Sequence, residues 1–174
     1  RPGIMDRFGL GPSELASLRP GIIYLTISCY GADGPFSDRA GWEQIAQSAT
    51  GICLDNGDAE RPQLLPATAC DYTTGYLGAY GVLLALARRA AEGGSYHVRV
   101  SLCQSGMHIY KQGQITYPEP GMDLTSAELE TIMMESQSGH GPLKHLKPVL
   151  RLSETSPHWD KPSPTPGAAA PEWL

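Results

Sequence analysis

Two short apolar stretches are separated by longer helical patterns in the first two thirds of the chain. Residues 22–28 are almost all apolar and rich in β-branched side chains, which predicts a strand covered on both faces, as in a parallel sheet. Residues 96–102 alternate polar and apolar side chains and predict a second strand. Because helical segments connect the two, we expect parallel strands in a βα-type unit, and hence an α/β fold.

The longest helical pattern covers residues 71–91 and ends at the glycines of 93–94. Gly75, Gly78 and Gly81 recur along it every three residues, although each costs roughly 1 kcal/mol relative to alanine inside a helix. Glycines at this spacing predict that one face of the helix approaches another backbone closely.

Shorter helices are predicted elsewhere in the chain, over residues 12–18, 42–49, 104–112 and 125–133. The second of these should turn Ile45 and Ala49 inward, because they lie four positions apart. A turn is predicted at 138–142. Prolines crowd residues 157–171, which excludes a helix or a central strand there and predicts a proline-rich C-terminal tail.

The composition narrows the class of protein. With 174 residues, of which 41% are apolar, the chain is long enough for one domain with a buried core. Its formal charge of −5 offers no broad positive surface to a nucleic-acid backbone, so we do not expect nucleic acid as a partner. The chain shows neither an apolar run that spans a bilayer nor a leader, which predicts a soluble, cytoplasmic protein without membrane contact.

The cysteines and histidines do not predict a metal site. The four cysteines, at 29, 53, 70 and 103, are too widely spaced for a zinc motif and are expected to be reduced, structural thiols. His140 and His145 are five positions apart across a glycine-proline turn, which does not match two zinc ligands on one helical face.

Asp71 begins the predicted long helix. At that place backbone N–H groups are unpaired and the macrodipole is positive, which favours an ionised carboxylate. The residue is either a helix N-cap or a nucleophile, and the local sequence does not choose between them. A glycine-rich turn at 30–35 follows the first strand, where open α/β sheets tend to bind ligands, although such a turn is a weak signal by itself.

Several segments, taken in order, resemble the family III CoA-transferases, which include formyl-CoA and carnitine CoA-transferases and α-methylacyl-CoA racemases. The resemblance covers about residues 1–112 and returns at 148–174. The segments are RPGIMDRFGL (1–10), IIYLTISCYGADGP (22–35), AGWEQIAQSATG (40–51), CDYTTG (70–75) and PVLRLSET (148–155).

The resemblance implies a fold and a chemistry. Residues 1–150 would form part of the family's Rossmann-like large domain, without its N-terminal portion and with a reduced small domain, and 151–174 a C-terminal return segment. Asp71 matches the catalytic aspartate, which attacks an acyl-CoA thioester to form an anhydride and then carries CoA as an aspartyl thioester. The amides of Tyr72 and Thr73 are expected to stabilise the oxyanion.

The resemblance also implies binding residues and partners. Arg7 matches a position that contacts CoA phosphates, and Trp42 a position where transferases often carry an aromatic residue near CoA. We therefore expect transfer of CoA from an acyl-CoA to a carboxylic acid by a homodimer, with the CoA thioester as substrate and no tightly bound cofactor.

Two other functions stay open at this point. One is a non-catalytic partner or remnant domain, because the family's N-terminal half is not found in the chain. The other is an acyl-CoA racemase or dehydratase, to which the main objection is that Trp42 stands where racemases place a proton-transferring histidine.

Overall fold

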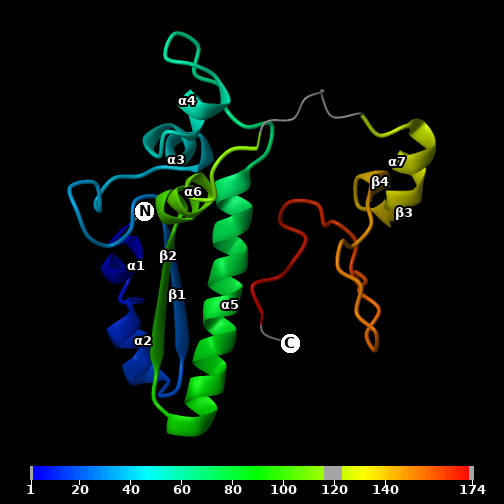
Figure 1. Ribbon diagram of the computed structural model, residues 1–174. Helices are drawn as coiled ribbons and strands as arrows, with labels where there is room; N and C mark the ends of the chain where they lie inside the picture. The colour runs from blue at the N-terminus through cyan, green and yellow to red at the C-terminus, as the bar shows by residue number, and fades with distance from the viewer. Residues whose placement is uncertain (1, 116–122, 173–174) are drawn as a thin grey trace. The chain divides into compact units, whose positions relative to one another are not determined.

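A computed structural model of the chain describes residues 2–115 and 123–172. Contacts within the chain define two compact units, Arg1–Ile115 and Thr116–Leu174, which are described separately (Figure 1). The predicted division at residue 150 was drawn from the family's domain pattern, and it stays a prediction. None of the described helices is both long and apolar enough to cross a membrane.

The first unit contains a pair of parallel strands, β1 (Ile23–Ser28) and β2 (Tyr96–Ser101), which confirms the predicted parallel arrangement. Tyr24 pairs with His97 in their register. The helices of this unit, in chain order, are α1 (Ile4–Arg7), α2 (Pro12–Leu18), α3 (Glu43–Ala49), α4 (Ile52–Asn56), α5 (Ala69–Glu92) and α6 (Leu102–Tyr110).

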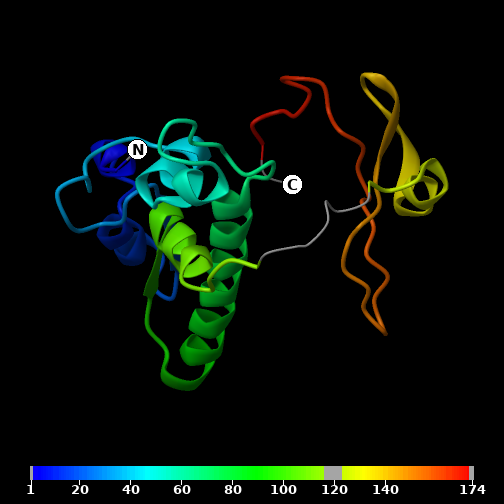
Figure 2. The same ribbon diagram turned by 45° about the horizontal axis from the view of Figure 1, so that its top comes forward.

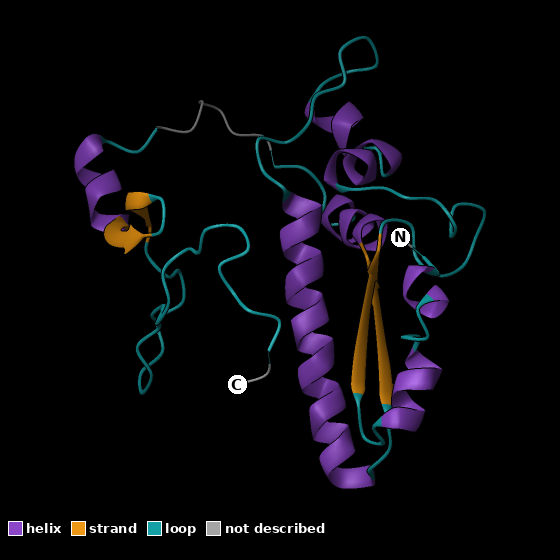
Figure 3. Ribbon diagram, turned by 180° about the vertical axis from the view of Figure 1, so that it is seen from behind, coloured by secondary structure: helices purple, strands orange, loops and turns teal. Residues whose placement is uncertain are grey.

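Helix α5 runs along one side of the strand pair, and α1 and α2 lie on the other side (Figure 3). Its glycines allow the close approach that the sequence predicts, at two of the three positions. A methyl group added to Gly81 would lie 2.7 Å from Val98 Cγ1, and one added to Gly78 would lie 3.3 Å from Leu25 Cδ2. Gly75 has open space instead, so it is not needed for this contact.

The prediction that β1 is covered on both faces is wrong for the described residues. Leu25 is 37% exposed and Ile27 is 51% exposed. The polar side chains of Thr26 and Arg99 lie side by side in the register and border an open groove. Apolar composition therefore predicted a strand correctly but not how far the chain covers it.

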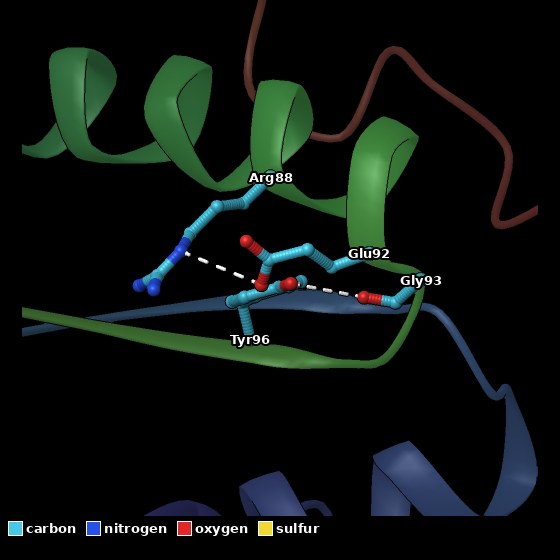
Figure 4. A network of polar contacts seen from close by, with 4 residues as sticks. All are labelled: Arg88, Glu92, Gly93 and Tyr96. Atoms are coloured by element: carbon cyan, nitrogen blue, oxygen red, sulfur yellow. Dashed lines mark hydrogen bonds and ion pairs between the residues drawn. The ribbon is translucent and has the colours of Figure 1, made fainter.

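The C-terminal end of α5 is joined to the start of β2 (Figure 4). The helix ends at Gly93, as predicted, with a φ of 72° that favours glycine. The Tyr96 hydroxyl donates a hydrogen bond to the Gly93 carbonyl over 2.9 Å, and Arg88 pairs with Glu92 at 3.8 Å. These contacts stabilise the reversal from helix to strand.

The core of the first unit lies where α3, α5 and α6 meet the carboxyl end of β1. Its buried apolar residues are Cys29, Ala46, Ile52, Cys70 and Leu102. The inward face predicted for α3 was partly wrong, because Ala49 is exposed whereas Glu43 and Gln47 are buried. Helix α6 begins at Leu102, two residues before the predicted start, because Ser101 caps it by accepting from the Gln104 N–H.

The second unit contains helix α7 (Ser126–Ile132) and an antiparallel hairpin of β3 (Met133–Ser138) and β4 (Gly141–Leu146). Thr125 and Glu128 form a capping box at the start of α7, and this helix confirms the one predicted over residues 125–133. The turn at 138–142 was predicted, but the strands on either side of it were not. Residues 147–172 form no helix or strand.

Candidate active site

The first turn of α5 carries Asp71 in a setting that differs from the predicted one. Asp71 is the third residue of the helix, and Thr68 occupies the N-cap position without a side-chain hydrogen bond. The alternative that Asp71 is itself the N-cap is therefore wrong. Its side chain is exposed, so it is open to a reactant from solvent.

The N–H groups at the start of α5 are bound by Glu43, which lies on α3 and is only 3% exposed. Cys70 N–H donates to Glu43 Oε1 over 3.1 Å, and Asp71 N–H donates to Glu43 Oε2 over 2.6 Å. A buried carboxylate thus takes the place of a side-chain cap, and it satisfies two of the four unpaired N–H groups that open a helix.

Gln47 lies one turn after Glu43 and is 1% exposed. Its amide nitrogen donates to Glu43 Oε1 over 2.6 Å and to the Ala67 carbonyl over 3.1 Å, and its amide oxygen accepts from the Leu65 N–H over 2.9 Å. We call Glu43 and Gln47 together the α3 clamp, because they bind both the start of α5 and residues 65–67, the arm that leads to it.

The electrostatics of the site raise the pKa of the Asp71 carboxyl above its ordinary value. Partial desolvation is the larger cause, and the negative charge of Glu43 is the second. The direction is opposite to the one that the helix dipole alone predicts. Burial also raises the pKa of Cys29 and of Cys70 to about 12, so these thiols stay protonated near neutral pH.

Both predicted oxyanion donors are occupied. The Tyr72 N–H donates to the Thr68 carbonyl over 3.1 Å, as part of the first helical turn. It is therefore not free to stabilise an oxyanion in this conformation. The Thr73 amide lies one residue further into the same helix, where each N–H binds the carbonyl four residues before it, so it is occupied as well.

Arg7 lies elsewhere, on an open groove of about 880 Å³ beside the carboxyl ends of the strands. It ends α1, and its side chain is exposed. Asp71 and Trp42 are not among the residues that line this groove. Trp42 is 60% exposed and forms the N-cap residue of α3, directly before Glu43. Asp71 thus contacts Glu43 through its backbone, Trp42 only precedes Glu43 in the chain, and Arg7 lies on the groove.

Sequence reasoning missed Glu43 and Gln47. The signal was present, because a glutamate and a glutamine four positions apart share a helical face. Their burial could not be predicted from one helix, since it depends on the arm and on α5. Among the described residues, no cluster of three or more histidine, cysteine or acidic side chains is arranged to hold a metal ion.

Comparison with known proteins places this chain in a family. The model of "CoA-transferase family III" matches residues 1–130. The chain belongs to CoA-transferase family III. One relative, the acetyl-coenzyme A transferase nodX of Hypoxylon pulicicidum, is 45% identical over 109 residues, which cover 59% of this chain and 18% of the relative. The succinyl-CoA–L-malate CoA-transferase beta subunit of Chloroflexus aurantiacus is 36% identical over 124 residues, covering 70% of this chain and 30% of that subunit.

Solved structures agree with this family III membership. The chain resembles Rv3272 of Mycobacterium tuberculosis with a TM-score of 0.60 and 31% identity, over 64% of this chain and 32% of that one. It resembles a CAIB/BAIF family protein of Brucella suis with a TM-score of 0.59 and 28% identity, over 63% of this chain and 29% of that one. The chain thus spans between 18% and 32% of the length of these relatives.

Proposed function

We propose that this chain supplies the nucleophilic carboxylate of a family III CoA-transferase, and that Asp71 is that carboxylate. The observation that carries the proposal is the pairing of an exposed Asp71 side chain with a raised pKa at the first turn of α5. Carboxyl groups with such a shift beside a fixed charge are concentrated at functional sites. A more basic carboxylate is also a better nucleophile once it is ionised.

The proposed reaction balances without proton transfer. An Asp71 carboxylate oxygen attacks the carbonyl carbon of an acyl-CoA thioester, a C–O bond forms, and the C–S bond breaks as CoA thiolate leaves with its electron pair. The thiolate then attacks the Asp71 carbonyl carbon of the mixed anhydride and releases the first acid. The carboxylate of the second acid attacks the aspartyl thioester, which forms a new mixed anhydride and frees CoA thiolate again. This thiolate attacks the carbonyl carbon of the new acyl group, which gives the product thioester and releases Asp71 as a carboxylate.

The proposed partners follow from the family and from the described groove. We propose acyl-CoA and a carboxylic acid as substrates, with CoA bound only as a substrate, and a homodimer as the assembly. Arg7 would contact the CoA phosphates, since a guanidinium on an open groove suits that anion. Trp42 would pack near CoA. An indole cannot exchange a proton at an α-carbon, so transfer is favoured over racemisation or dehydration.

Trapping with hydroxylamine tests the proposal. The protein is incubated with acetyl-CoA or succinyl-CoA, hydroxylamine is added, and the peptide that contains Asp71 is analysed by mass spectrometry. Because hydroxylamine converts an anhydride or an aspartyl thioester to a hydroxamate, we expect this modification at Asp71 and its loss in Asp71→Asn. A hydroxamate on another carboxylate, or none with either thioester, contradicts the assignment.

A non-catalytic CoA-binding or partner subunit is the second candidate. The observation that favours it is that Asp71 does not line the groove on which Arg7 lies. In that case the chain would bind CoA without forming a covalent intermediate, and the hydroxylamine experiment would leave Asp71 unmodified.

A further inference from the structure

The α3 clamp contacts Asp71, the candidate nucleophile, through the backbone of Asp71 rather than through the Asp71 side chain. Both carboxylate oxygens of Glu43 are occupied, Oε2 by the Asp71 N–H and Oε1 by the Cys70 N–H and the Gln47 amide. Among the described residues, no buried side-chain polar atom lacks a hydrogen-bond partner. A buried carboxylate with this many fixed donors holds one position and one orientation.

The clamp also determines where the backbone of the site lies. Gln47 binds the chain on both sides of Pro66, at Leu65 and at Ala67, just before α5 begins. Because Glu43 and Gln47 project from the same helix, the arm and the start of α5 are fixed to a single rigid element. A displacement of this element would move the Cα of Asp71 with it.

We propose that Glu43 is a positioning residue of the CoA-transfer site, which orients Asp71 through the backbone and drives its attack by charge repulsion. This inference rests on the proposed function of Asp71. The repulsion acts in a definite direction, because two carboxylates near each other disfavour the state in which both are charged. When Asp71 becomes acylated it loses its charge, so the repulsion is relieved in the step that forms the anhydride.

The charged and titratable groups around Asp71 come from every element packed there. Glu43 belongs to α3, Cys70 to α5 and Cys29 to the end of β1, and Cys103 of α6 lies against Cys29. The pKa of each of these three thiols is raised, so they are neutral near pH 7. Glu43 is therefore the charge that acts on Asp71 in this region.

The first test measures the Asp71 carboxyl directly by carbon NMR across a pH titration, without any substrate. In Glu43→Gln the pKa of Asp71 should fall relative to the wild type, since the repelling charge is gone while the side-chain volume is kept. Glu60→Gln is the matched control, because Glu60 is exposed and is not among the charges that shift the pKa of Asp71. An unchanged Asp71 titration in Glu43→Gln overturns the proposal.

The second test repeats the hydroxylamine trap as a function of pH. We expect Glu43→Gln to form the Asp71 hydroxamate about tenfold more slowly, because a displaced carboxylate attacks less efficiently. We also expect the acid limb of its pH profile to move to lower pH. A purely structural role of Glu43 would slow the reaction and leave the acid limb in place. That result would overturn the proposal.

A third measurement needs no variant and covers the case in which Glu43→Gln does not fold. In the wild-type chain, the Asp71 carboxyl should titrate above the pKa of an unperturbed aspartate, because desolvation and the charge of Glu43 both favour its protonated form. A titration at or below that ordinary pKa contradicts the proposal. Both NMR measurements are independent of acylation, so a failure of the transfer reaction itself is recognised separately, by an absent hydroxamate in the wild type.

Discussion

At the scale of single residues, the three glycines of α5 look equivalent in the sequence but have different surroundings in the folded chain. A methyl group at position 81 would lie 2.7 Å from Val98 Cγ1, whereas one at position 75 would meet nothing within 4 Å. The helix propensity of alanine favours both substitutions equally. Only the packing against β2 separates them.

Gly81→Ala should destabilise the chain by about 1–3 kcal/mol, because the valine is short and cannot move aside. Gly75→Ala, the matched control on the same helix, should stabilise it by roughly 0.5–1 kcal/mol. The free energies of unfolding from urea titrations check both. Equal effects of the two substitutions would mean that α5 does not pack on β2 as described.

The sequence predicted some residues of the site and missed others for a physical reason. Asp71 was identified because a family motif surrounds it, and its place near the helix start was correct. Glu43 was missed, because a glutamate in a short helix is expected to face solvent. Its burial results from contacts with residues 27 and 28 positions later in the chain.

At the scale of elements, α5 and α6 meet through a buried pair of hydroxyl groups. Thr74 Oγ1 donates to Ser105 Oγ over 2.7 Å, and both side chains are 1% exposed. Beside this pair, a methyl group added to Gly106 would lie 3.2 Å from Cys70 Sγ. The hydrogen bond and the tight packing together fix α6 against the first turns of α5.

Thr74→Val should cost about 1–3 kcal/mol of unfolding free energy, because it leaves the Ser105 hydroxyl buried without this partner. The double variant Thr74→Val/Ser105→Ala should cost less than the sum of the two single variants, since no polar group is then left behind. Thr73→Val is the control at the neighbouring, half-buried position. Additive single effects in denaturant titrations would argue against the hydrogen bond.

Most elements of the first unit were predicted, and their ends were set by local signals such as Gly93 after α5 and Pro12 at the start of α2. The hairpin of β3 and β4 was not predicted. Its strands, MMESQS and GPLKHL, lack both a β-branched run and a regular alternation of apolar residues. Pairing with each other, rather than propensity, makes them strands.

At the scale of the whole molecule, the chain corresponds to 18% of one curated family relative and 30% of another. Its groove nevertheless has a volume of about 880 Å³ and carries Arg7 and Arg99. Each guanidinium group can bind a phosphate, although Asp6 and Asp38 on the same groove offset their charge. CoA binding by the 174-residue chain can therefore be measured separately from catalysis.

Calorimetric titration of the chain with CoA should detect binding in the micromolar range. Arg7→Gln should weaken it by about tenfold, as expected when a charged hydrogen-bonding partner of a phosphate is lost. Arg61→Gln removes an equally exposed charge outside the groove and should leave the affinity unchanged. No heat with the wild type, or equal loss in both variants, would contradict CoA binding at this groove.

The sequence by itself determined the family, both strands of the first unit and most of the helices, since helix caps, glycines and apolar periodicity act over a few residues and motifs persist in order. The parallel pairing of β1 and β2 also followed, because the helices between them allow it. Only the tertiary structure decided that Glu43 is buried against the start of α5, that Asp71 lies three positions after the N-cap, and that Leu25 and Ile27 of β1 stay partly exposed. Each of these depends on contacts between segments distant in the sequence, which no local pattern specifies.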